Sequence, residues 1–170
     1  MSRSLKVLAL AAAFSGLAGG AHADTRYLAF DADDRATQSL TRGITLEVER
    51  GLFGATRVRG LFSSTSRGSA SFSEVSPSGV FDVLPQEARG GQIYGMKPEG
   101  DGPALGRALC PGSEEAWLVV GRVRIGRPLT VHAVGRWADG KNRHCVALNY
   151  RYRGEWASGP RPQGDLPADR

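Results

Sequence analysis

The stretch WLVVGRVRIGRPLTVHAVGRWADGKNRHCVALNYRYRGEW, residues 117–156, contains the pattern that decides the fold. Three runs rich in β-branched and aromatic residues occupy 117–125, 129–137 and 144–153. Turn-forming residues separate them, with Gly126 and Pro128 in the first gap and Asp139, Gly140 and Asn142 in the second. Short apolar runs joined by such turns are typical of antiparallel strands. The stretch therefore predicts a C-terminal three-stranded β-meander.

The chain before this stretch continues the same pattern of short strands and turns. Further candidate strands lie at 25–30, 44–49, 56–62, 80–84 and 92–96. Gly accounts for 23 of 170 residues, about twice its ordinary usage, which favours turns over long helices. Residues 105–110 could form one or two helical turns, and this is the one short helical segment that we expect. We predict an all-β domain, a small antiparallel β-sandwich, with a small β-barrel as the alternative.

The composition limits the chain to one modest core. Apolar residues make up 41% and charged residues 23%, and the mean hydropathy is -0.28. These values are unlike those of a disordered polyelectrolyte or of a protein with many membrane spans. We expect a single β-rich domain over residues 24–156, followed by a disordered Pro/Gly-rich tail over 157–170.

The first 23 residues have the organisation of a secretory signal peptide. Arg3 and Lys6 precede an apolar segment over 7–17, and Ala21 and Ala23 form a small-x-small cleavage site. The apolar segment is too short and too rich in Gly to span a bilayer comfortably, and no later segment is a candidate transmembrane helix. We therefore expect cleavage after Ala23 and a periplasmic or secreted protein without a transmembrane segment.

Both cysteines of the chain, Cys110 and Cys145, lie in the part expected to be exported. An oxidising compartment allows thiols to pair, so we expect one intrachain disulfide between them. It would join the segment that enters the meander to the last strand of the meander.

Motifs that carry catalytic chemistry are missing from the sequence. It contains no G-x-S-x-G elbow, no P-loop and no G-x-G-x-x-G pattern, so we assign no catalytic residue and no cofactor. His132 and His144 lie on neighbouring predicted strands and could form half of a metal site. The spacing shows no third ligand, and we therefore expect no metal site.

Arginines recur at alternate positions on the predicted strands of the meander. The candidate anion-binding residues are Arg122, Arg124, Arg136, Arg151 and Arg153. Residues two apart lie on one face of a strand, so these guanidinium groups could form a cationic sheet face. Such a face would bind an anionic envelope polymer or an acidic protein; the alternative is a solvated face balanced by glutamates. Removal of Arg3 and Lys6 leaves a net charge of about +3, too small for a nucleic-acid-binding surface.

These observations favour an exported domain of the bacterial envelope that acts as a binding or structural module, with anionic envelope components as its candidate ligands. Two alternatives remain: a cell-envelope hydrolase whose active site is unrecognised, and a carrier for a small ligand. A filled core would favour the module. Convergent carboxylates in a deep pocket would favour the hydrolase, and an enclosed cavity would favour the carrier.

Overall fold

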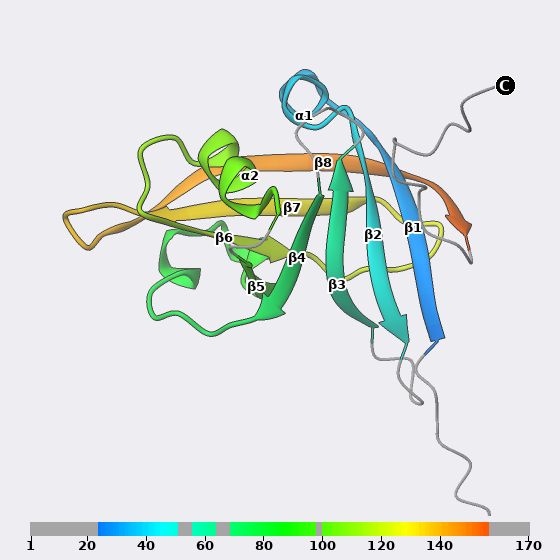
Figure 1. Cartoon of the computed structure of the whole chain (residues 1–170), viewed down its shortest axis with the longest axis horizontal. Helices are drawn as coiled ribbons and strands as arrows, with labels where there is room; N and C mark the ends of the chain where they lie inside the picture. Colours follow the sequence, from blue (N-terminus) through cyan, green and yellow to red (C-terminus); the bar gives the residue numbers. More distant parts are fainter. Residues whose placement is uncertain (1–23, 51–55, 64–68, 98–99, 157–170) are drawn as a thin grey trace, which may run out of the picture.

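Figure 1 shows the computed structural model of the chain, which describes residues 24–50, 56–63, 69–97 and 100–156. The expected signal peptide at 1–23 and the expected tail at 157–170 lie outside the described residues. The strands are β1 (Asp24–Ala32), β2 (Gly43–Arg50), β3 (Thr56–Ser63), β4 (Ser69–Glu74), β5 (Gln92–Met96), β6 (Glu115–Val120), β7 (Leu129–Arg136) and β8 (Asn142–Trp156). The helical elements are α1 (Arg35–Leu40), α2 (Gly102–Leu109) and the 3-10 turns η1 (Phe81–Val83) and η2 (Gln86–Ala88).

The eight strands form a closed antiparallel barrel in chain order (Figure 1). The all-β class is confirmed, and the barrel, which was the alternative, replaces the expected sandwich. The length of β8 explains the closure, because Tyr150 pairs with Leu129 of β7 on one side and with Ala32 of β1 on the other. The first half of β8 thus belongs to the meander, while its second half reaches β1. Each of the described strands therefore pairs with a neighbour on both sides.

The meander is confirmed, although its first strand is shorter than predicted. β6 ends at Val120, so residues 121–125 are not part of a strand.

Two other segments also differ from the prediction. Residues 80–84 contain the turn η1 instead of a strand, and the expected loop after β1 contains α1, capped by the Asp34 carboxylate, which accepts a hydrogen bond from the Thr37 N–H at 2.8 Å.

Side chains from every strand fill the inside of the barrel. Those with almost no exposed surface include Phe30, Leu46, Tyr94, Leu118 and Tyr150. Burial of side chains of this size stabilises a fold by about 1.5 to 3 kcal/mol each. In the part of the chain that the structure describes, no helix is long and apolar enough to cross a membrane.

Helix α2 is the predicted helical segment, and it covers β4, β5 and β6. Leu105 and Leu109 project from it into the interior of the barrel. Cys110, directly after the helix, forms a disulfide bond with Cys145 of β8, and the two Cα atoms are 5.4 Å apart. The expected pairing of the two cysteines is confirmed.

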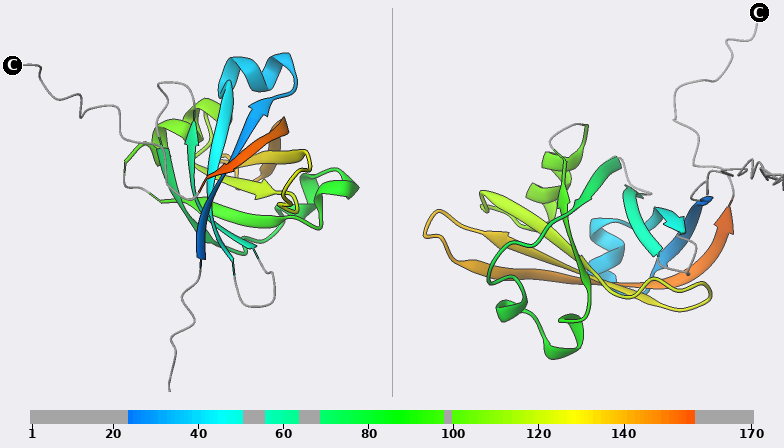
Figure 2. Two further views of the ribbon diagram at one scale, coloured as in Figure 1. Left: turned by 90° about the vertical axis from the view of Figure 1, so that its right-hand side faces the viewer. Right: turned by 90° about the horizontal axis from the view of Figure 1, so that it is seen from below.

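Residues 75–91, between β4 and β5, form an outer lobe on the outside of the barrel (Figure 2). Val80 and Leu84 of this lobe pack against Trp117, Val119 and Val134 on the outer face of β6 and β7. The lobe is also held by the side-chain amide of Asn142, which donates to the Ser78 carbonyl oxygen at 2.8 Å. The barrel therefore has apolar packing on both faces of β6 and β7.

Candidate functional site

The structure divides the five predicted anion-binding arginines into two groups, so they do not form one sheet face. Arg151 and Arg153 lie on β8, where Arg151 pairs with Asp33 at 2.9 Å and Arg153 with Asp31 at 3.6 Å. At the other end of the meander, Arg136 forms an ion pair with Glu115, and its guanidinium lies 5.4 Å from the centre of the Trp117 ring. These three charges are balanced by carboxylates, two of them aspartates where the alternative of a solvated face named glutamates.

Arg122 and Arg124 lie instead in the connection between β6 and β7, residues 121–128, which we call the docking loop. The ladder with β7 ends where the Gly121 N–H donates to the Thr130 carbonyl oxygen at 3.0 Å. Val123 then packs against the barrel core and anchors the loop. Arg122 and Arg124, on either side of Val123, are both exposed.

The tip of the docking loop combines cationic and apolar side chains. A turn in which the Arg127 N–H donates to the Arg124 carbonyl oxygen at 3.3 Å places Ile125 at the tip, with 45% of its surface exposed. Gly126 has a φ of 72°, a backbone conformation that favours glycine. Arg122, Arg124 and Arg127 are all exposed, and none forms an ion pair with any of the residues described. The loop therefore presents three unbalanced guanidinium groups around one exposed apolar side chain.

A second group of polar side chains lies beside the docking loop, on the outer face of β7 and β8. Nδ1 of His132 and Nε2 of His144 are 3.1 Å apart, so the two rings contact each other directly. They line a recess of about 480 Å³, the histidine recess, between the outer lobe and the meander. Its walls also include Glu87 from the outer lobe, Asn149 of β8, and Arg122.

A β-bulge in β8 brings the two histidines to the same face. Regular alternation would give His144 the orientation of Leu148 and Tyr150, which point into the barrel. The register shifts between Ala133 and Val134, so that His144 pairs with Val134, on the outer face that carries His132. His132 and His144 therefore lie together on the outer face, an arrangement that the sequence left open.

Burial changes the protonation of His132. Only 7% of its surface is exposed, and desolvation together with the nearby His144 lowers the pKa of its imidazole, against a smaller opposite effect of Glu87. The His132 ring is therefore more often neutral at neutral pH than a free imidazole. Among the residues described, no group of three or more His, Cys, Asp or Glu side chains is arranged to hold a metal ion.

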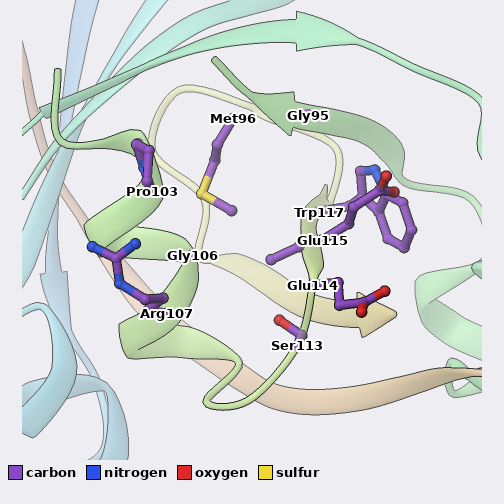
Figure 3. A pocket seen from close by; sticks show the side chains of 11 residues that line it. Gly95, Met96, Pro103, Gly106, Arg107, Ser113, Glu114, Glu115 and Trp117 are labelled. Carbon is purple, nitrogen blue, oxygen red and sulfur yellow. The ribbon is translucent and has the colours of Figure 1, made fainter. Parts of the chain in front are cut away.

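A larger recess, of about 520 Å³, lies between α2 and β6 (Figure 3). Figure 3 shows Met96 pointing into this space, with Arg107 on the helix side and Glu115 and Trp117 on the strand side. Glu115 is already paired with Arg136, so one of the two acidic side chains that line this recess has its charge balanced. We therefore place the candidate functional site at the docking loop.

Comparison with protein-family models, with curated proteins and with solved structures finds no match for this chain. The docking loop was missed in the sequence because residues 121–125 alternate apolar and polar side chains as a strand does. Gly121, followed by Gly126 and Pro128, is the signal that could have indicated it.

Proposed function

We propose that this chain is an exported domain of the bacterial envelope that binds anionic, phosphate-bearing amphiphiles through its docking loop. The observation that carries the proposal is the contrast between the two groups of arginines. Arg151 and Arg153 are balanced by Asp33 and Asp31, whereas Arg122 and Arg124 have no carboxylate partner among the described residues and lie just before the exposed Ile125.

This combination of side chains suits a lipid-like anion better than a soluble polymer. A guanidinium group binds phosphate oxygens through two parallel hydrogen bonds, and a cationic side chain at an anionic membrane surface contributes about 1 kcal/mol. Ile125 gains nothing from a soluble polyanion, but it can be buried among acyl chains. Val123 packs against the side chains inside the barrel and so presents the loop without a large cost in ordering.

The other two classes have less support. A carrier of the usual kind holds its ligand inside the barrel, where buried side chains already pack in the described strands. For the hydrolase, the acidic residue Glu115 at the larger recess is engaged with Arg136. A binding module therefore remains the function that the geometry supports best.

The test compares two variants that each remove two positive charges. Co-sedimentation with vesicles that contain phosphatidylglycerol should show about 30-fold weaker binding for R122Q/R124Q, which corresponds to the loss of about 2 kcal/mol. R151Q/R153Q is the matched control and should bind nearly as well as the unchanged protein. Binding should also weaken as salt rises, and it should be poor on phosphatidylcholine vesicles.

A third variant separates the lipid from other anions. I125S should weaken binding to the vesicles while leaving the binding of soluble inorganic polyphosphate unchanged. Equal losses in R122Q/R124Q and R151Q/R153Q, or binding that does not depend on salt, would contradict the assignment to the docking loop. An unchanged affinity of I125S for the vesicles would leave a simple polyanion site and would contradict the amphiphile.

A further inference from the structure

The histidine recess contains a pair of imidazoles that the docking loop does not use. His132 and His144 come from adjacent strands of a closed barrel, and the bulge in β8 holds both on the outer face. Their ring centres are 5.1 Å apart and the ring planes meet at 46°. The nitrogens that approach each other are Nδ1 of His132 and Nε2 of His144, at 3.1 Å.

We propose that His132 and His144 bind one divalent transition-metal ion, such as Zn²⁺, Cu²⁺ or Ni²⁺. Imidazole nitrogen is a common ligand of these ions, at about 2.0 to 2.1 Å for Zn²⁺. If an ion lies at this distance from two nitrogens that are 3.1 Å apart, the N–metal–N angle is roughly 98°. That angle lies between the square-planar and tetrahedral values, so both nitrogens can bind one ion once the rings turn from their mutual contact toward it.

The protonation of the pair also suits a metal ion. Imidazole binds a metal only in its neutral form, and the buried position of His132 disfavours the protonated ring. The charged groups that face the pair are Glu87 from the outer lobe and Arg122 from the docking loop. Glu87 offsets part of the charge that an ion would bring, whereas Arg122 opposes it.

The recess leaves room for the other ligands of the ion. Its volume of about 480 Å³ can hold several water molecules, and Asn149 and Thr130 provide polar groups on its wall. Because the described residues supply no third strong ligand, water would complete the coordination. Such a site is open and exchangeable, unlike a closed structural zinc site. The spacing of the two histidines indicated half of a metal site at most, and the missing third ligand led us to predict none.

The test is a titration of the full chain, purified without a polyhistidine tag, with ZnCl₂, CuSO₄ or NiCl₂. Calorimetry should show one ion per chain at pH 7.5, with weaker binding at pH 5.5, and MgCl₂ should not bind. His144 is exposed, so H144N should keep the fold while losing at least about tenfold in affinity. P128A, a change to the wall of the same recess that removes no polar group, is the matched control and should change the affinity little.

A second measurement identifies the ligands. Addition of Zn²⁺ should shift the imidazole NMR signals of both histidines, and Zn²⁺ should raise the melting temperature of the unchanged protein but not of H144N. Equal stoichiometry and affinity in H144N would overturn the proposal, as would no binding of any of the three ions. In either case the pair is a hydrogen-bonded contact that only supports the fold. Neither readout depends on vesicles, so this result is independent of the proposed docking function.

Discussion

Removal of the Cys110–Cys145 disulfide should cost a large share of the stability of the domain. The bridge joins residues 35 positions apart, between the end of α2 and β8. The chain-entropy model gives about 3.8 kcal/mol for a loop of this length, because the bridge restricts the unfolded chain. An unfolding entropy of about 0.28 kcal/mol/K for a domain of this size converts that loss into roughly 14 °C of melting temperature.

The assay is urea unfolding of C110A/C145A, followed by circular dichroism, beside the unchanged protein before and after reduction. The variant should remain folded in water, because Leu105 and Leu109 still bury the face of α2. Vesicle binding should also survive, since α2 precedes β6 and the docking loop follows it, at the other end of that strand. A loss below about 1 kcal/mol would refute the reasoning, and so would a loss of vesicle binding in a variant that remains folded.

Two further predictions concern buried polar groups. Because the pKa of His132 is lowered in the folded protein, the unfolded chain binds more protons near pH 6.5 and below. The free energy of unfolding should therefore fall as the pH is lowered from 7.5 to 5.5. In urea titrations at these two pH values, H132Q should show a smaller fall. Y94F should cost about 1 to 3 kcal/mol, because the buried Val58 N–H loses its acceptor, the Tyr94 hydroxyl at 3.1 Å. Y150F should cost less, since the Thr41 hydroxyl keeps its bond to the Thr37 carbonyl oxygen; equal losses would contradict this account.

The strands of the meander could be predicted because their apolar runs and turns agree with each other. The closure of the barrel could not, because it depends on the second half of β8 reaching β1, and the sequence that does so, ending at Trp156, reads only as more strand. Helix α1 was missed for a similar reason. Its six residues contain no apolar repeat long enough to indicate a helix, and the Asp34 cap and tertiary contacts hold it.

The histidine pair shows most clearly what a pattern of alternation cannot provide. Strict alternation puts His144 inside the barrel and Cys145 on the outer face, away from α2. One extra residue in β8 reverses both, so that His144 meets His132 while Cys145 reaches Cys110. A bulge of this kind depends on packing across the whole sheet, and the local sequence carries no signal for it.

The central claim is that the tip of the docking loop inserts among the acyl chains of an assembly of anionic amphiphiles, such as a vesicle surface. The most direct test replaces Ile125 with cysteine and attaches an environment-sensitive fluorophore to it. The matched control carries the same label on a cysteine in place of Ser73, on the exposed face of β4. The native cysteines are joined in the disulfide, so the new thiol can be labelled selectively. We predict a blue shift of the emission on phosphatidylglycerol vesicles for the label at position 125 and none at position 73. No shift at position 125, or equal shifts at both positions, would contradict the claim.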